Sequence, residues 1–477
     1  MALAMILFPM LMAAIAAALP SNRWRPCLLP LTAVVHLAST LAALAQPAGS
    51  APMVWLALDP AGRVVVLQIS VLFVLCSFYA VGYLRYREEQ SNRVFCTCLL
   101  AFLGVASLVA WAHHLGLMWV AIEASTLVTA PLIYFNHTPR SIEATWKYLL
   151  VGSVGIALAL LGTFFLAYSS LHAGLDSSLT LEGLLAHAPQ LSKPWLHAAF
   201  VLLLVGYGTK MGLAPMHTWK PDAYGEAPGV VGAMLAGGVT SCAFLALLRV
   251  YHICHAAGED AYVSRLLLFM GLFSIAVAGV FMVGQRDFKR MLAYSSVEHM
   301  GILVVGLGIG PAALYGTLLH VITNGLTKGV LFLSAGNIHR AFASKSTDQV
   351  RGAMHRLPLS GGLFLAGFFA ITGSPPFGPF VSEFSILNGA FESGRYATGA
   401  MYLCFLLLVF IGMGSTVLKV TQGHAPPEAG DRSYRDGFLT VAPIGALLAL
   451  VLALGLYIPA PLGAMLDAAV RFLEGQA

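Results

Sequence analysis

The sequence predicts an all-α polytopic membrane protein, that is, one whose helices cross a lipid bilayer many times. Of its 477 residues, 58% are hydrophobic and only 10% are charged, whereas soluble domains carry about 25% charged residues. Apolar stretches of about 18 to 25 residues, each long enough to cross the hydrocarbon core as a helix, recur along the whole chain. Prolines interrupt two of these stretches in related ways. Together these observations predict about 14 transmembrane helices, two of them broken.

The expected spans follow one another with mostly short connections. The first, MALAMILFPMLMAAIAAALP, resembles a secretory signal peptide but lacks a basic start, and many similar segments follow, so we read it as a membrane helix. Residues 172–196 form the longest polar connection before the C-terminal half, and 460–475 form a short amphipathic tail. In order, the expected spans are residues 2–20, 28–46, 64–84, 94–113, 115–135, 147–171, 197–216, 229–254, 264–284, 291–309, 311–338, 358–376 continuing through 380–390, 397–421 and 437–458.

The basic residues of the connections predict the orientation of the chain. Eighteen lysine and arginine residues fall in connections after odd-numbered spans, with Lys220, Lys289 and Arg432 among them, and five fall in the other connections and the tail. Cytoplasmic connections are enriched in basic residues. We therefore expect both termini on the non-cytoplasmic side of a bacterial or archaeal cell (inner) membrane.

Several function classes are excluded by what the sequence lacks. The net charge is +5, and no basic stripe with interleaved aromatic residues indicates nucleic acid. There is no GxGxxG opening a βαβ unit, no haem attachment site and no CxxC among the seven cysteines, most of which lie in apolar segments. We expect no cofactor and no metal in this chain, so any electron chemistry occurs in partner subunits.

Five ionisable residues stand inside expected spans. They are Glu123, Lys210, Glu298, Lys328 and Glu383. A charge at the bilayer centre costs about 3 kcal/mol on insertion scales, so such residues are rare and mark ion pathways by default. The alternative is that Glu123 and Glu383 form packing pairs with the lysines. A purely structural protein would do better with apolar residues there, because desolvation offsets most of the attraction within a buried ion pair.

Histidines extend this set of titratable residues. His320, Asn324 and Lys328 fall at positions i, i+4 and i+8 in LHVITNGLTKGV, so they share one helix face and climb about 12 Å along it. His299 directly follows Glu298. A polar ladder across an apolar helix suits a proton wire, in which water joins titratable groups.

Other polar residues near the span ends have a simpler expected role. Arg249 stands near the end of the span 229–254, and we expect its side chain to snorkel to the interface. We expect wet surface histidines at His113 and His114, at a membrane boundary, and at His339 and His355, at or in the connection after the span 311–338.

Prolines break the seventh and twelfth spans at matching places. The seventh carries GLAPMHTWKP, with Pro215, and the twelfth carries ITGSPPFGPF, with Pro375 and Pro376. Proline removes an intrahelical hydrogen bond, and the freed backbone is tolerated in lipid only where protein or water satisfies it. Broken helices at corresponding places in two halves indicate an inverted repeat with a site near the midplane. Lys210 precedes the first break and Glu383 follows the second, so water at the unwound backbone lowers the cost of each charge.

A five-helix unit brings the two breaks into register. Spans four to eight then form one repeat and spans nine to thirteen the other, in inverted topology because five is odd. The expected divisions are residues 1–93 with the first three spans, 94–255 and 256–421 with the two inverted five-helix repeats, and 422–477 with the last span and the tail.

Four stretches resemble a known family. KMGLAPMHTWKPDAYGEAP, RDFKRMLAYSSVEHMGIL, HVITNGLTKGVLFLSAG and GSPPFGPFVSEF are similar to the antiporter-like membrane subunits of respiratory complex I, Mrp-type sodium/proton antiporters and membrane-bound hydrogenases. The resemblance covers roughly 94–421, and SSVEHMG with AITGSPPFGPFVSEF is most similar to the F component of hydrogenase-4 (formate hydrogenlyase-type) complexes. It implies a fourteen-helix core with two inverted half-channels joined by a central polar axis.

The resemblance also implies roles in proton translocation for single residues. Glu123 matches a family glutamate whose partner is a lysine, here Lys210. Lys328 with His320 matches a polar helix face, and Glu383 matches a charged residue that leads to one exit.

Lys147, in EATWKYLL, matches a further family lysine, but two positions depart from the family pattern. Ser241 stands where members often have a lysine, and serine cannot hold the charge; Asn324 stands where some members have a second histidine. Either the central relay runs through water with Glu298 and His299, or this protein conducts poorly. We favour the first, because Glu298 adds a titratable group in the neighbouring region.

Three functions fit these residues. We expect a proton-translocating subunit of a multi-subunit redox complex, of the hydrogenase-4 or NADH:quinone oxidoreductase type, whose partners are other membrane subunits, lipid and protons. The first alternative is a subunit of an Mrp-type Na⁺/H⁺ antiporter, although no dense cluster of oxygen ligands for sodium stands inside a span. The second is a non-conducting membrane scaffold of a hydrogenase.

Overall fold

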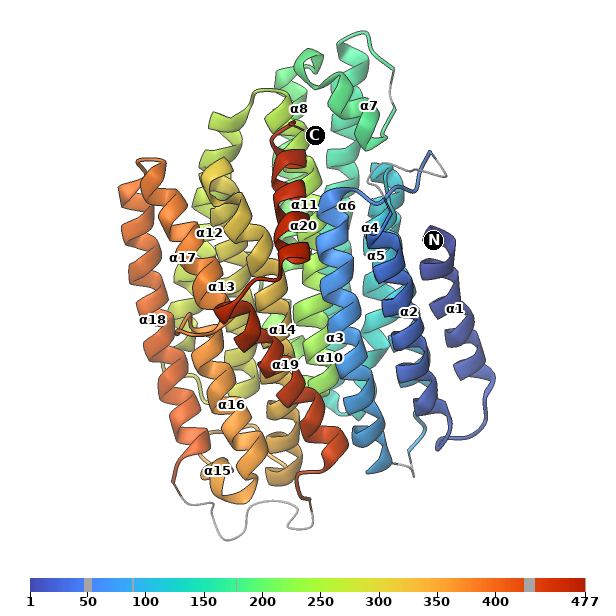
Figure 1. The fold of residues 1–477 in the computed structure, drawn as a ribbon, viewed down its shortest axis with the longest axis vertical. Helices are drawn as coiled ribbons and strands as arrows, with labels where there is room; N and C mark the ends of the chain where they lie inside the picture. Colours follow the sequence, from blue (N-terminus) through green and yellow to red (C-terminus); the bar gives the residue numbers. More distant parts are fainter. Residues whose placement is uncertain (47–53, 88–89, 177, 424–433, 477) are drawn as a thin grey trace.

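The computed structural model describes residues 1–46, 54–87, 90–176, 178–423 and 434–476, which form a bundle of helices (Figure 1). The described residues contain no β-strand, only three isolated bridges between connections. The predicted all-α membrane class is confirmed. Arg432, one of the basic residues used for the orientation, lies outside the described residues.

The helices follow the expected spans in order. The N-terminal helices are α1 (Ala2–Ala18), α2 (Leu28–Leu44) and α3 (Pro60–Arg85). The next group is α4 (Arg93–Trp111), α5 (Leu115–Ile133), α6 (Pro139–His172), α7 (Leu181–Ala186), α8 (Lys193–Met211), α9 (Trp219–Glu226), α10 (Gly229–Met234), a π-helical turn (Leu235–Val239) and α11 (Thr240–Ala256). The rest are α12 (Asp260–Met282), α13 (Phe288–Ile309), α14 (Pro311–Phe342), α15 (Ala353–Arg356), α16 (Pro358–Ile371), α17 (Gly378–Glu392), α18 (Tyr396–Thr421), α19 (Phe438–Leu456) and α20 (Ala460–Leu473).

Among the described residues, 11 helical segments are long and apolar enough to cross a membrane, and α1 and α16 are shorter apolar helices. The expected span 197–216 corresponds to α8, and the twelfth span is divided between α16 and α17. The count of 14 spans and the division into inverted repeats stay predictions.

Burial separates a central group of helices from an outer one. In Gly229–Ala256 and Pro311–Phe342, all 18 residues of the most apolar stretch are buried inside the protein. In the spans that contain α2 and α19, only 33% of the residues of that stretch are buried. The outer helices expose large apolar side chains, among them Leu150 and Val154 of α6 and Leu407 and Ile411 of α18. Because such a surface is stable only in an apolar solvent, the outer helices face lipid or other subunits and the central group holds the polar residues.

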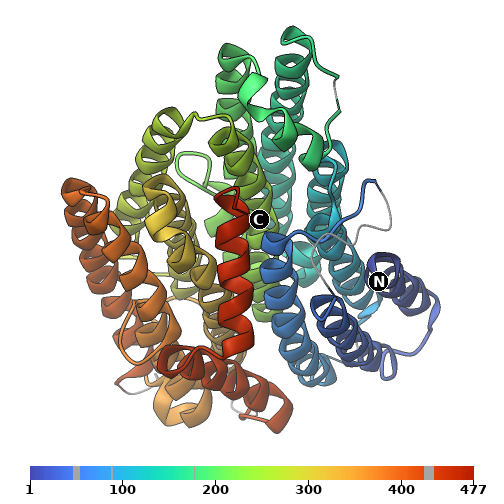
Figure 2. The same cartoon turned by 45° about the horizontal axis from the view of Figure 1, so that its top comes forward.

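The long central helix α14 contacts α3, α10, α13, α16, α17 and α19, so it holds the two sides of the bundle together. Figures 1 and 2 show α16–α18 on one side of the molecule and α1–α2 on the other. The expected amphipathic tail is α20, which lies against α3 and α14.

Both predicted helix breaks are present. α8 ends at Met211 and the chain resumes as α9 at Trp219, with Pro215 between them. α16 ends at Ile371 and α17 begins at Gly378, with Pro375 and Pro376 between them. Each break contains one cis X-Pro bond.

Candidate functional site

Glu123 of α5 and Lys210 of α8 meet through a hydroxyl group. Lys210, with 1% of its surface exposed, donates from Nζ to Thr126 Oγ1 at 2.6 Å and to Tyr148 OH at 2.8 Å. Thr126 Oγ1 in turn donates to Glu123 Oε2 at 3.3 Å, and Ser153 donates to Glu123 Oε1 at 3.0 Å. We call Lys210, Thr126 and Glu123 the first unit. The lysine is buried, and the glutamate is only partly buried.

Lys328 and Glu298 repeat this arrangement in the other half of the chain. Lys328, 0% exposed, donates from Nζ to Ser295 Oγ at 2.7 Å. Ser295 Oγ donates to Glu298 Oε2 at 3.4 Å, and Glu298 is 2% exposed. We call Lys328, Ser295 and Glu298 the second unit. In both units one hydroxyl group stands between an ammonium and a carboxylate.

A cluster of histidines continues from the second unit. His299 Nε2 lies 3.7 Å from Glu298 Oε2, and His299 Nδ1 lies 3.0 Å from His320 Nε2. His299 Nδ1 is also 3.9 Å from Glu383 Oε1, at the start of α17 just beyond the second break. We call His299, His320 and Glu383 the histidine cluster. Within the described residues it is the one group of three or more His, Cys, Asp or Glu side chains that could hold a metal ion.

Lys220 is a further buried lysine close to both units, which the sequence predicted to lie in a connection. It is 0% exposed and donates from Nζ to Ser296 Oγ at 3.0 Å and to Ser296 O at 3.2 Å. Ser296 follows Ser295 of the second unit directly. On the other side, Trp219 packs on the Tyr148 ring, with centroids 5.0 Å apart, and Tyr148 holds Lys210.

The break after α8 makes room for Lys220. Gly212 has φ +77°, and a Cβ added there would lie 2.4 Å from Lys220 Cδ. Any larger residue would therefore both strain the backbone and displace the lysine. The signal available in the sequence was the position of Lys220 within the broken stretch GLAPMHTWKP, where the chain returns to the interior instead of leaving the membrane.

The two units, Lys220 and the histidine cluster form a series of mostly buried ionisable groups, which we call the buried row. Lys147 does not belong to it. Its side chain is 46% exposed and pairs with Glu143 at 2.6 Å and Asp222 at 2.8 Å. Asn324 is buried on α14, but within the described part of the chain its Oδ1 has no hydrogen-bond partner. Ser241 donates to Gly237 O of its own helix at 2.8 Å, so it is not placed as a relay.

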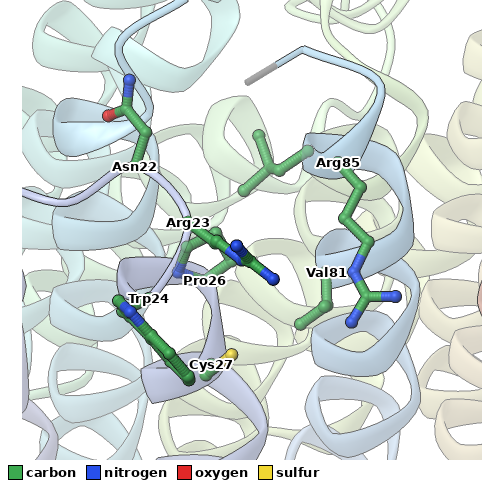
Figure 3. Close-up of a pocket in the computed structure, with 8 residues that line it drawn as sticks. Asn22, Arg23, Trp24, Pro26, Cys27, Val81 and Arg85 are labelled. Carbon is green, nitrogen blue, oxygen red and sulfur yellow. The ribbon is translucent and has the colours of Figure 1, made fainter. Parts of the chain in front are cut away.

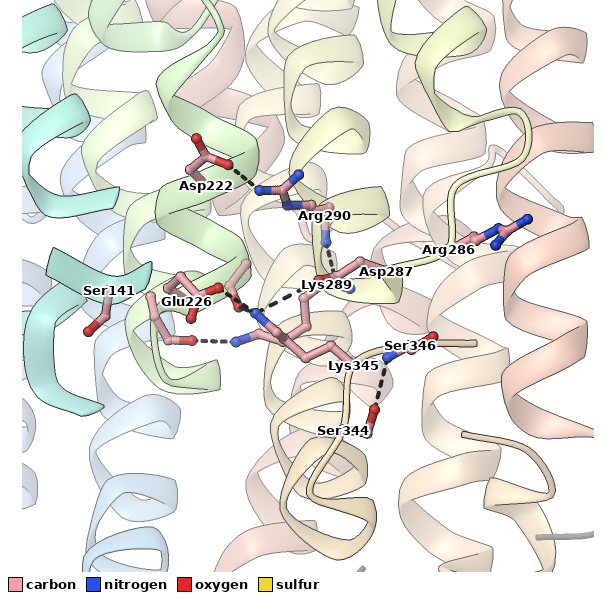
Figure 4. A network of polar contacts seen from close by, with 12 residues as sticks. Ser141, Asp222, Glu226, Arg286, Asp287, Lys289, Arg290, Ser344, Lys345 and Ser346 are labelled. Atoms are coloured by element: carbon pink, nitrogen blue, oxygen red, sulfur yellow. Dashed lines mark hydrogen bonds and ion pairs between the residues drawn. The ribbon is translucent and has the colours of Figure 1, made fainter. Parts of the chain in front are cut away.

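A network of ion pairs lies where α9, α13 and the connection after α14 meet (Figure 4). Lys345 contacts Glu226 at 2.7 Å and Asp287 at 3.8 Å, and Arg290 pairs with Asp222. Lys289, also assigned to a connection from the sequence, is 1% exposed and donates to Ala227 O. A cavity of about 650 Å³ opens beside the network.

The expectation that Arg249 snorkels to the interface is wrong. Its side chain is 1% exposed and pairs with Asp59 at 2.7 Å. The same guanidinium donates to the backbone oxygens of Val109, Ala110 and Ala112 at 2.7 to 3.0 Å. Because the planar guanidinium offers five donors, it ties the connection before α3 to the end of α4.

The histidines at the span ends differ from one another. His355 is exposed as expected, whereas His113, His114 and His339 are partly buried. Burial lowers the pKa of His113 and of His114, which lie between α4 and α5, so both are neutral at pH 7.

A second cavity, of about 530 Å³, lies between the start of α2 and the end of α3 with Arg23 and Arg85 on its walls (Figure 3). It is separate from the buried row.

Four of the seven cysteines, Cys76, Cys96, Cys242 and Cys254, are buried as small apolar side chains, while Cys27 and Cys404 are exposed and Cys98 is intermediate.

The chain matches known proteins over most of its length. Residues 112–412 match the family described as NADH:quinone oxidoreductase/Mrp antiporter, transmembrane. The hydrogenase-4 component F homolog of Methylacidiphilum infernorum is 34% identical over 421 residues, which cover 84% of this chain and 87% of that protein.

Two solved structures share the fold. A chain of the Mrp complex from Dietzia sp. is similar with a TM-score of 0.87 at 19% identity, over 99% of this chain and 97% of that one. A chain of respiratory complex I from Thermus thermophilus is similar with a TM-score of 0.79 at 26% identity, over 96% of this chain and 97% of that one.

Proposed function

The chain belongs to the NADH:quinone oxidoreductase/Mrp antiporter family and is one of its antiporter-like membrane subunits, and from this premise we propose that it carries protons across the bilayer for a redox complex. The observation that carries the proposal is the pair of lysine–hydroxyl–glutamate units, each with a buried lysine, and the buried Lys220 that donates to Ser296 beside the second unit. Buried charges are costly and apolar substitutes would stabilise a mere scaffold, so this series of ionisable groups supports a proton path.

Each hydroxyl group in the row is suited to pass a proton on. A hydroxyl accepts on a lone pair and donates its own hydrogen, so Thr126 can move a proton between Lys210 and Glu123 without a change in its own charge. Ser295 stands in the same position between Lys328 and Glu298. Lysine is suited to this role because its ammonium loses a proton when buried, whereas arginine keeps its charge.

Coupling to electron transfer would be electrostatic. Two unit charges about 7 Å apart interact by about 2 kcal/mol at an effective dielectric constant of about 20. Since one pKa unit corresponds to about 1.4 kcal/mol, a charge that appears beside Glu123 would change the protonation of Lys210 more than tenfold. The change would then pass through Lys220 to the second unit and leave by the histidine cluster.

The partners and orientation follow from the same premise. The complex I and Mrp chains that share this fold come from multi-subunit membrane complexes, and the hydrogenase-4 relative is named as a component. We place the redox cofactors in partner subunits of a hydrogenase-4 or complex I type, with both termini on the non-cytoplasmic side. A Na⁺/H⁺-exchanging role of the Mrp type is the second candidate, favoured by the fold shared with the Mrp complex.

Proton pumping by the native complex in vesicles tests the proposal, with substrate oxidation followed in parallel. Lys210→Met should lower pumping about a hundredfold or more, the range for loss of an acid–base group, with assembly intact. Lys147→Met, at an exposed lysine, is the control and should pump like the wild type. Unchanged pumping and oxidation in Lys210→Met would make Lys210 a packing residue and the whole protein a scaffold.

A further inference from the structure

The histidine cluster brings three metal-binding side chains together from three helices. Ligand atoms of His299, His320 and Glu383 all lie within 4.8 Å of one another, and all three side chains are buried. In a tetrahedral Zn²⁺ site the donors lie about 2.1 Å from the ion, and hence about 3.4 Å from one another. His299 Nδ1 is 3.0 Å from His320 Nε2 and 3.9 Å from Glu383 Oε1, so the separations bracket that value. Shifts of about half an ångström would open one distance and close the other.

The outer partner of the His320 imidazole is of the kind that a metal site requires. The Ser382 hydroxyl donates to Pro379 O at 3.0 Å, so it accepts from His320 Nδ1–H at 2.9 Å. That hydrogen bond leaves the lone pair of His320 on Nε2, the atom that faces His299. The other nitrogen of His299, Nε2, lies 3.7 Å from Glu298 Oε2. Metal-bound histidines almost always hydrogen-bond through their second nitrogen, as His320 does with Ser382, and the Glu298 carboxyl group lies beside that nitrogen of His299.

An unpaired carboxylate oxygen also favours a cation. Glu383 Oε1 is buried, and no hydrogen-bond partner for it is found among the described residues. A buried polar atom left unpaired costs about 1–3 kcal/mol, which a bound ion would remove for the carboxylate. Lys328 and Lys220 both lie near His299 and oppose a cation, but Lys328 donates to Ser295 and Lys220 to Ser296.

We propose that His299, His320 and Glu383 form a binding site for Zn²⁺ or a similar late first-row divalent cation, and that the bound ion blocks proton transfer beyond the second unit. Two imidazoles and one carboxylate select such ions over Mg²⁺ and Ca²⁺, which prefer oxygen ligands alone. Binding displaces the proton that His299 Nδ1 shares with His320 Nε2, and the proton moves to His299 Nε2 beside Glu298. With both facing nitrogens on the metal, neither can accept a proton.

The histidine cluster borders an exposed part of the chain. Glu383 is 7% exposed, and a Cβ added to Gly373 would clash with its Oε2. The carboxylate therefore borders the break between α16 and α17. Pro375 and Pro376 in that break are exposed. The break is therefore the exposed part of the chain that lies beside the site.

Binding is tested on the purified native complex. Zn²⁺ affinity is measured by competition with a chromophoric chelator, and Co²⁺ replaces Zn²⁺ for its visible absorption. We expect one Zn²⁺ site of micromolar or tighter affinity, a tetrahedral Co²⁺ spectrum, and a loss of at least about a hundredfold in affinity in both His320→Gln and Glu383→Gln. His252→Gln, at a buried histidine on α11 outside the row, is the control and should bind like the wild type. Equal Zn²⁺ affinity in the wild type and both ligand variants, or no binding at 0.1 mM, would overturn the site.

The proposed block of proton transfer rests on the proposed function. It is tested separately, by measuring proton pumping with and without Zn²⁺. We expect saturating Zn²⁺ to lower pumping by wild type and His252→Gln about tenfold or more, and millimolar Mg²⁺ to have no effect. Tight binding with undiminished pumping would overturn the block and remove the histidine cluster from the proton path, while the metal site would stand. If Lys210→Met also pumps normally, the proposed function fails independently of the metal site.

Discussion

The first and second units use the same three groups in different surroundings. In both, a buried lysine reaches a glutamate through one hydroxyl group. In the first unit the lysine has a second acceptor, Tyr148, and the glutamate is partly exposed. In the second unit the lysine, the hydroxyl and the glutamate are all buried, and no other side-chain acceptor for Lys328 Nζ is found within the described residues.

This difference indicates how the row is organised. A partly exposed carboxylate responds to charge outside the protein, so the first unit is suited to receive a signal from a neighbouring protein of the complex. A fully buried unit is screened little by solvent or salt, so the second unit responds mainly to charge along the row.

The largest effect is expected from Lys328→Arg. Arginine keeps the positive charge but does not release a proton, so the second unit would keep its electrostatics and lose its proton transfer. We expect proton pumping to fall about a hundredfold, with assembly of the complex retained, as measured in vesicles beside substrate oxidation. Pumping at the wild-type rate with an arginine there would show that Lys328 serves as a fixed charge.

Lys220→Leu should separate the two units while each keeps its own hydrogen bonds. Because Lys220 is the buried side chain that reaches Ser296, we expect pumping to fall about tenfold or more. Gly212→Ala should give a smaller loss in the same direction, since the added Cβ displaces the lysine chain. Lys345→Leu, in the ion-pair network outside the row, is the matched control. Equal pumping by Lys220→Leu and Lys345→Leu would show that protons do not pass between the two units by way of Lys220.

Removing the central hydroxyl should affect the two units unequally. Ser295→Ala takes away the acceptor of Lys328, and we expect a drop of about tenfold, or about 1.4 kcal/mol, in pumping. Thr126→Val should cost only about two- to threefold, because Lys210 keeps Tyr148 and Glu123 keeps Ser153. The pumping rates of Ser295→Ala and Thr126→Val are compared at the same rate of substrate oxidation. If Thr126→Val is the more severe of the two, the contrast in burial does not govern transfer.

The smallest effect concerns an ion pair outside the membrane. Glu259, just before α12, accepts from Lys193 and from His197 at 2.7 Å each, and these hydrogen bonds lower the pKa of Glu259. A depressed pKa means that the stabilisation is complete above the unfolded-state pKa and is lost as the pH falls through the lower, folded-state pKa. Thermal unfolding of wild type and Glu259→Gln should differ by at most about 1 kcal/mol at pH 7, and the two should converge in acid. Pumping should be unchanged, so a pumping defect in this variant would place the path elsewhere.

Much of the candidate site could be predicted from the sequence, since charge is rare in lipid. Glu123, Lys210, Glu298, Lys328 and Glu383 stand out because each interrupts a long apolar run, and all five lie in or beside the two units. Lys147 shows the limit of a family resemblance, because it matches a family position and yet lies exposed in a surface ion pair.

The sequence by itself determined the solvent, the order of the helices and the two breaks, because hydrophobic length and proline act locally along the chain. Tertiary structure alone decided which residues near the ends of spans turn inward. Lys220 and Arg249 have the same local signature as residues that reach the interface, and what buries them is Ser296 and Asp59, 76 and 190 positions away. The hydroxyl that completes each unit could not be identified from the sequence either, since serine and threonine are common in these helices. Only the packing of α5 and α8 against α6, and of α13 on α14, selects Thr126 and Ser295.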